Sequence, residues 1–97
     1  MPRAVLLDTR DNVATLIDAG KKGEKLQITG ESGELVSLAA EVPYGHKCAI
    51  KPISKGGEIL KYGQVIGRAT TAIKVGEHVH VHNVEALRAR GDIKESN

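Results

Sequence analysis

The sequence predicts a single all-β domain built from short strands joined by tight turns. Of its 97 residues, 17 are Val or Ile, the β-branched types that favour strands. Eleven glycines against three prolines supply the backbone freedom that tight turns need. With no Phe or Trp and only two Tyr, the core must be packed from small aliphatic side chains. These features argue against a helical bundle.

The N-terminal half of the chain contains four apolar segments of strand length. Residues 5–7 and 13–17 are short apolar runs, and the polar cluster 8–12 separates them. Residues 25–29 alternate between apolar and polar side chains, and residues 35–40 follow after a glycine-containing turn. These last two segments are predicted to form a hairpin.

The C-terminal half adds four predicted strands. Alternation over residues 46–51 directs Cys48 towards the core, and shorter strands are predicted at 58–61, 64–69 and 78–82. In the last of these strands, Val79 and Val81 would point into the core.

One short helix and a tail are predicted to end the chain. Residues 84–90 suit one or two helical turns ended by Gly91, and residues 92–97 are polar and expected to be frayed. The domain is therefore expected to cover residues 1–91.

A weak internal repeat recurs three times. In residues 17–26, 53–59 and 73–79, an isoleucine is followed by a glycine-containing turn, a glutamate and a returning apolar residue. We interpret the repeat as a corner in which glycine adopts the unusual backbone angle that reverses the chain.

Charge and composition exclude several classes of function. Residues 47–74 carry a net charge of +5, against +2 for the whole chain, so this basic middle can attract an anion. Nucleic acid is a poor candidate because aromatic stacking side chains are almost absent. No apolar run reaches the length of a membrane span, and the first residues lack a signal-peptide pattern. The lone cysteine excludes a disulfide framework, and we expect a cytoplasmic protein.

Three histidines within five residues are the sharpest local signal. On a strand, His78, His80 and His82 would all project from one face. A surface strand whose polar face consists of imidazoles accounts for this pattern equally well. A metal site is limited by geometry, since neighbouring side chains on one face lie about 6.6 Å apart. Two adjacent histidines can bind one ion, but all three can hardly do so on a straight strand, so a metal would need ligands from elsewhere. His46 is the one further imidazole in the sequence, and we expect no metal site in this chain.

A second interpretation is recognition of an anion or a hydroxyl-rich ligand. Imidazoles and the Asn83 amide can hydrogen-bond to hydroxyl and carboxylate groups. Lys47, Lys61 and Arg68 would supply a positive field, although solvation of the surface is the ordinary role of a lysine. Cys48 lies two residues from His46, but with no third orienting group in view we interpret it as a buried core residue.

Several motifs in fixed order give the chain a resemblance to a known family. They extend from Asp11-Asn12-Val13-Ala14 through Pro43-Tyr44-Gly45-His46-Lys47, Ile53 to Glu58, Lys61-Tyr62-Gly63 with Ile66-Gly67 and Ala69, and Ile73 with Gly76-Glu77, to Val79-His80-Val81-His82-Asn83. Together they resemble the SAF-like small domain of the altronate/galactarate dehydratase family, whose stand-alone relatives include the small (alpha) subunit of sulfolactate sulfo-lyase.

The resemblance implies a β-clip fold and a lyase whose large, metal-dependent part acts on a hydroxy acid. It implies catalytic roles for His80 and His82 and substrate-binding roles for His46, Lys47 and Asn83, whereas His78 is not a motif position. It implies no cofactor in this chain and a metal ion, with iron as a candidate, in a partner subunit. The large part would be a separate polypeptide, unless the chain is a fragment.

Two functions lead on the sequence, and a small stand-alone metal protein remains a third possibility. The first is the small subunit of a two-component carbon–oxygen or carbon–sulfur lyase, with a large catalytic subunit and a small hydroxy acid as partners. The alternative is a non-catalytic module with the same fold that binds a carbohydrate or a protein. With either function, the protein can be an oligomer. The sequence does not choose among altronate, galactarate and sulfolactate as the substrate.

Overall fold

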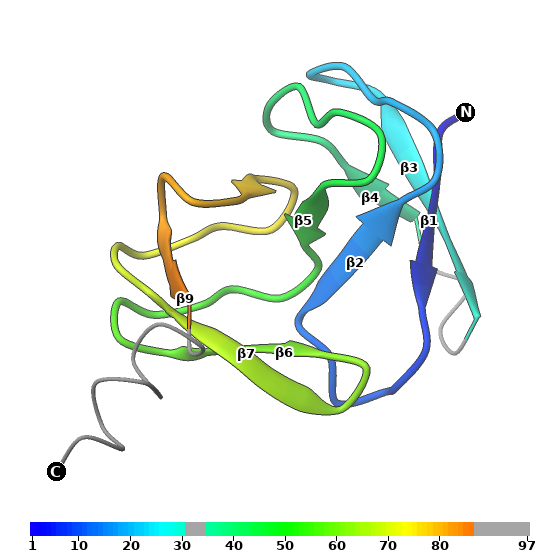
Figure 1. The fold of residues 1–97 in the computed structure, drawn as a ribbon. Coiled ribbons are helices and arrows are strands. Elements are labelled where there is room, and N and C mark those ends of the chain that lie inside the picture. The colour runs from blue at the N-terminus through cyan, green and yellow to red at the C-terminus, as the bar shows by residue number, and fades with distance from the viewer. Residues whose placement is uncertain (31–34, 87–97) are drawn as a thin grey trace, which may run out of the picture.

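A computed structural model describes residues 1–30 and 35–86, and this part of the chain consists of strands and turns without a helix (Figure 1). The strands are β1 (Arg3–Leu6), β2 (Val13–Leu16), β3 (Lys25–Gly30), β4 (Leu35–Ser37), β5 (Lys47–Ala49), β6 (Glu58–Lys61), β7 (Gln64–Ala69), β8 (His78–Val79) and β9 (Val84–Ala86). The all-β prediction is confirmed, and the curled, strand-only architecture agrees with the β-clip that the resemblance implies.

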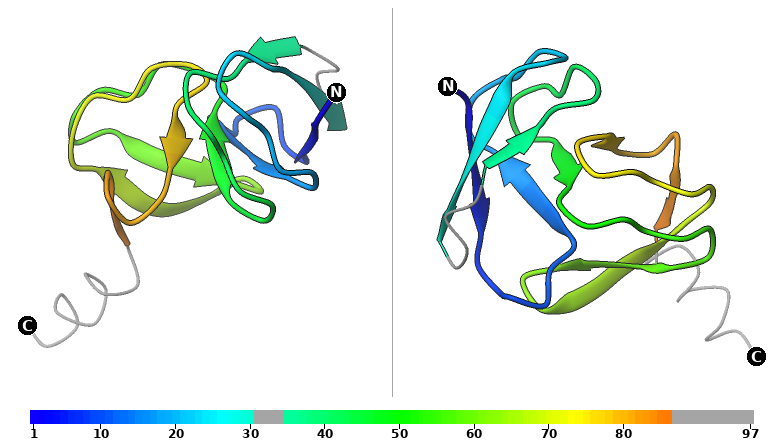
Figure 2. Two further views of the ribbon diagram at one scale, coloured as in Figure 1. Left: turned by 90° about the horizontal axis from the view of Figure 1, so that it is seen from above. Right: turned by 180° about the vertical axis from the view of Figure 1, so that it is seen from behind.

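The strands form two sheets. The larger has the order β4-β3-β1-β2-β5-β8, in which only β1 and β3 run parallel. β3 and β4 pair antiparallel, which confirms the predicted hairpin. The smaller sheet has the order β6-β7-β9. The views in Figures 1 and 2 place the smaller sheet at one end of the molecule and β1, β3 and β4 at the other, with β2 and β5 between them.

β9 corrects the prediction of a helix. Residues 84–86 were expected to begin a helix, but they pair antiparallel with β7, and Val84 packs against buried residues. The sequence of residues 84–86 does not reveal that the backbone of β7 is available to pair with them. The remainder of the predicted helix, residues 87–90, and the predicted tail, residues 92–97, lie outside the described residues.

The buried side chains form two groups. The first core consists of Ala4, Leu6, Ala14, Leu16, Leu26, Ile28, Val36, Leu38, Val42 and Cys48. The second core consists of Val13, Ala49, Ile53, Ile59, Ala69, Ile73 and Val79. β2 and β5 contribute to both, since successive residues of a strand point to opposite faces. These two strands therefore join the two halves of the molecule.

The repeated corner predicted from the sequence is present in the structure. Gly23, Gly56 and Gly76 occupy its three copies with φ angles of 90°, 84° and 89°. In the first and third copies the glutamate closes the turn, because the side chains of Glu24 and Glu77 accept hydrogen bonds from backbone N–H groups three residues earlier. These corners bring otherwise distant strands together.

The histidine-rich strand is shorter than predicted. β8 ends at Val79, and residues 80–83 form a turn in which the backbone N–H of Asn83 donates to the carbonyl of His80. Val79 is fully buried as expected, but Val81 is 81% exposed, so its predicted place in the core is wrong. The turn breaks the two-residue alternation on which that prediction relied.

Candidate functional site

Imidazole rings gather where β5 and β8 meet. The two strands run antiparallel with Lys47 opposite Val79. Continuing this register places His46, which precedes β5, opposite His80, which follows β8. The two rings are stacked, with their centroids 4.1 Å apart. A predicted substrate-binding residue thus lies beside a predicted catalytic one.

His78 and His82 complete the group, and we call these four residues the histidine cluster. The ring centroid of His78 is 5.1 Å from that of His46, 5.5 Å from that of His80 and 5.1 Å from that of His82. Nδ1 of His46 and Nε2 of His78 lie 2.9 Å apart, so one ring donates a hydrogen bond to the other. His78 and His82 are much closer than the roughly 13 Å expected on a straight strand, because the turn after Val79 folds them together.

His78 is the member that the sequence interpretation left without a role. It faces His46 directly, although their positions are 32 residues apart in the chain. Only the pairing of β5 with β8 brings them together. Nothing in the sequence around His46 indicates that its strand pairs with the strand of His78. The central place of His78 was therefore missed.

Asn83 shapes the turn that carries the cluster. Its Oδ1 accepts a hydrogen bond of 3.0 Å from the backbone N–H of His80, and its Nδ2 donates one of 2.9 Å to the carbonyl of His78. Asn83 is 6% exposed, so both bonds are sheltered from water. Asn83 thus positions two of the rings, while its expected contact with substrate stays a prediction.

Partial burial keeps rings of the cluster uncharged. Desolvation lowers the pKa of His78 from its usual 6.5, and the charges that His46, His82, His80 and Lys47 can carry lower it further. Desolvation is also the main cause that lowers the pKa of His80, followed by the charges of its neighbours. At pH 7 both rings are therefore neutral, and each has a nitrogen lone pair that can accept a proton or bind a cation.

Of the basic residues predicted to attract an anion, Lys47 is the one whose charge lowers the pKa of both His78 and His80. It is half-buried, and desolvation, with the charge of Lys61 as a second cause, lowers its pKa. An ammonium group in such surroundings attracts an anion more strongly than one in bulk water. Arg68 is differently placed, because Glu58 and Glu85 lie opposite it on the neighbouring strands.

Two hollows border the cluster. One of about 420 Å³ is lined by Glu41, Thr71, Glu77, His78, His82 and Asn83, among others. The second, of about 180 Å³, is mainly apolar and is lined by Lys47, Ile66, His80, Val81, Val84 and Ala86. The larger hollow falls within the range of pockets that hold small ligands. Every predicted site residue except His46 therefore lines one of the two hollows.

Cys48 takes no part in this surface. It is fully buried in the first core, which confirms its interpretation as a core residue. Burial raises the pKa of its thiol to about 12, so the thiolate is absent at neutral pH.

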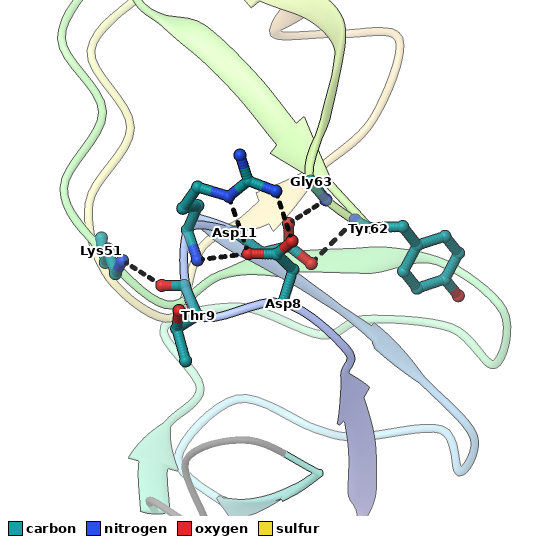
Figure 3. Close-up of polar contacts among 7 residues, drawn as sticks. Asp8, Thr9, Asp11, Lys51, Tyr62 and Gly63 are labelled. Atoms are coloured by element: carbon teal, nitrogen blue, oxygen red, sulfur yellow. Dashed lines mark hydrogen bonds and ion pairs between the residues drawn. The ribbon is translucent and has the colours of Figure 1, made fainter.

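A second polar group, around Asp11, holds the two sheets in place (Figure 3). The buried carboxylate of Asp11 accepts hydrogen bonds from the backbone N–H groups of Tyr62, at 2.8 Å, and Gly63, at 2.7 Å. The amide of Asn12 bonds to the backbone of Glu58 and Leu60. These bonds fix the β6–β7 hairpin to the β1–β2 connection, so the sequence motif at residues 11–14 begins with a structural clamp.

The part of the chain that the structure describes contains no helix with the length and hydropathy that a membrane span requires.

Comparison with protein families gives a match over almost the whole chain. The family model described as "Altronate/galactarate dehydratase SAF domain" matches residues 2–87. An altronate dehydratase from Bacillus subtilis is 35% identical over 85 residues, which are 88% of this chain and 16% of that enzyme. The chain thus spans about a sixth of the length of this relative.

Shorter relatives are also similar. The (2R)-sulfolactate sulfo-lyase subunit alpha of Paracoccus pantotrophus is 34% identical over 62 residues, which are 63% of this chain and 92% of that protein. The protein of the same name from Chromohalobacter salexigens is 47% identical over 47 residues, which are 48% of this chain and 50% of that protein.

Proposed function

This chain belongs to the altronate/galactarate dehydratase SAF domain family, and on that basis we propose that it is the small subunit of a two-component lyase that acts on a hydroxy acid. The observation that carries the proposal is the similarity to a sulfo-lyase subunit alpha, of which the matched segment makes up 92%. Because nearly all of that relative matches this chain and its name calls it a subunit, a separate polypeptide is expected as its partner. This supports a large subunit as the partner of this chain.

The chemistry of such a lyase sets the requirements for the site. Elimination abstracts a proton next to a carboxylate while a hydroxyl or sulfite group departs, so it needs a base, an acid and positive charge near the carboxylate. The histidine cluster and Lys47 supply groups of these three kinds within one surface. That collection supports catalysis more strongly than any single residue does.

We assign roles accordingly. His80 and His82 transfer protons to or from the substrate, because each ring borders one of the two hollows beside the cluster. Lys47 and His46 bind the carboxylate. Asn83 contacts the substrate from the larger hollow while it holds the turn.

The remaining parts of the proposal concern the partner. The large subunit binds the metal ion, with iron as a candidate, and its surface closes over the cluster. The roles proposed for the residues of this chain do not involve that metal ion. The complex works in the cytoplasm, where Cys48 stays reduced.

The test is reconstitution. The chain should be co-purified with a candidate large subunit, and the complex should be assayed with altronate, galactarate and sulfolactate. We expect the isolated chain to be inactive and the complex to turn over one of these acids. His80→Ala should lower kcat of the complex by about 100-fold or more, the usual contribution of a general acid or base.

Two controls make this result specific. Lys55→Ala removes an exposed lysine from the corner before β6 and should leave kcat unchanged, whereas Lys47→Ala should raise KM. His80→Ala should also leave the unfolding midpoint of the isolated chain unchanged, since His80 lies in a turn.

Turnover by the isolated chain would refute the two-component proposal. Binding of a hydroxy acid or a protein without turnover in any complex would favour the non-catalytic module.

A further inference from the structure

We propose that His46, His78 and His80 form a binding site for a divalent transition-metal ion of the zinc class. Each ring offers one nitrogen, and the three nitrogens all lie within 4.8 Å of one another. The site shares His46 and His80 with the proposed lyase function and adds His78, to which that function gives no role. Because a bound ion occupies a nitrogen lone pair of His80, metal binding and proton transfer by that nitrogen exclude each other.

The spacing of the nitrogens suits a common ion. An ion about 2.1 Å from each of its ligands, in tetrahedral geometry, holds the ligand nitrogens about 3.4 Å apart. Nδ1 of His46 and Nε2 of His78 already lie 2.9 Å apart. The other separations, all within 4.8 Å, close to the required distance by rotation of the side chains. All three residues are only partly buried, so their rings have room to rotate.

The present hydrogen bond between His46 and His78 shows that their nitrogens are directed at each other. One of these two nitrogens carries a proton, which must move to the other nitrogen of its own ring when both bind an ion. This tautomer change releases no proton from a neutral ring. Binding thus replaces one hydrogen bond by coordinate bonds to the same two atoms.

The ligand set indicates the class of ion. Imidazole nitrogens suit Zn²⁺, Cu²⁺ and Ni²⁺, whereas Mg²⁺ and Ca²⁺ need oxygen ligands. Three protein ligands leave one position free, as in catalytic zinc sites. His78 lines the larger hollow together with Glu41 and Glu77. A water molecule or a substrate oxygen can reach the free position from that hollow.

The sequence alone argued against a metal here, and the structure explains the difference. That expectation treated His78, His80 and His82 as one face of a straight strand. The turn after β8 and the pairing of β5 with β8 replace His82 by His46 as the third neighbour. The geometric limit on a straight strand therefore does not apply to these three rings.

The test is a titration of the purified 97-residue chain with Zn²⁺, after treatment with a chelator, followed by calorimetry. Substitution by Co²⁺ gives a second readout, because imidazole-bound Co²⁺ in tetrahedral geometry has intense visible absorption. We expect one ion per chain and no binding of Mg²⁺. His78→Gln should weaken the affinity for Zn²⁺ by more than about 100-fold, since even the loss of a group that only hydrogen-bonds to a ligand costs about 10- to 100-fold.

His82→Gln is the matched control, because His82 is in the histidine cluster but outside the three ligands, and this variant should lose much less affinity for Zn²⁺ than His78→Gln. Circular dichroism should verify the fold of each variant, with His80→Gln replacing His78→Gln if the latter unfolds. Absence of binding, or equal affinity in wild type and His78→Gln, would overturn the site. Zinc binding by a chain that supports no lyase in any complex would remove the proposed function and leave the metal site intact.

Discussion

Asn83 organises the histidine cluster without contributing a ring to it. Its amide bonds to the backbone at His78 and at His80, and so sets the turn that brings these two side chains together. A single buried amide therefore links the local backbone to the arrangement of the candidate site. In the sequence, Asn83 is merely the end of an alternating run of valines and histidines.

Cys48 provides a pH-dependent test of the core at the residue scale. The pKa of its thiol is about 12 in the folded chain, against an ordinary value of 9.0. Above pH 9 the unfolded chain loses this proton while the folded chain keeps it, so stability should fall as the pH rises from 9 towards 12. The Cys48 contribution to this slope can reach about 1.4 kcal/mol per pH unit.

Urea unfolding at pH 7.5, 9 and 10 measures this slope, and Cys48→Ala is the control because other groups titrate equally in both proteins. The free energy of unfolding of Cys48→Ala should depend less on pH than that of the wild type. Parallel curves for the two proteins would mean that the thiol is not buried as described.

At the scale of elements, turns rather than strand sequences decide which strands meet. The β6–β7 hairpin turns at Tyr62 and Gly63, whose φ angles are 55° and 76°. Such angles are uncommon for a tyrosine, and the carboxylate of Asp11 holds both of these backbone N–H groups. Asp11 thereby stabilises a turn 51 residues further along the chain.

Asp11→Ala should lower the free energy of unfolding by about 3 kcal/mol, because it removes two hydrogen bonds to a buried charged acceptor. Chemical denaturation of the isolated chain measures this loss. Asp8→Ala is the comparison, since Asp8 forms an ion pair with the exposed Arg10 at the surface, and the loss there should be clearly smaller than that of Asp11→Ala. Equal losses for the two variants would contradict the role of Asp11 as a clamp.

At the scale of the whole molecule, β2 and β5 make one unit out of two cores. Val13 and Ala49 belong to the second core, while their neighbours Ala14 and Cys48 belong to the first. These two strands pair with each other, so neither core can lose its packing without disturbing the other. The histidine cluster lies at the edge of this shared region, where β8 joins β5.

The two cores should therefore unfold together. Leu16→Ala in the first core should cost about 3 kcal/mol, and Ile59→Val in the second core should cost about 1 kcal/mol. Each variant should lower the hydrogen-exchange protection of β3 and β7 alike. Protection of β7 that is unaffected by Leu16→Ala would show that the two cores unfold separately.

The sequence by itself determined the fold class, most strand positions, the glycine corners and the family, because each depends on local periodicity, on a residue's backbone preference or on motifs in order. The predicted strands at 58–61 and 64–69 coincide with β6 and β7. Only the tertiary structure decided that residues 84–86 form a strand, that Val81 is exposed and that His78 meets His46. The strand at 84–86 and the contact of His78 with His46 depend on pairing between distant segments, which leaves no signal within a short stretch of sequence. Val81 is exposed because the turn at residues 80–83 breaks the alternation of the strand.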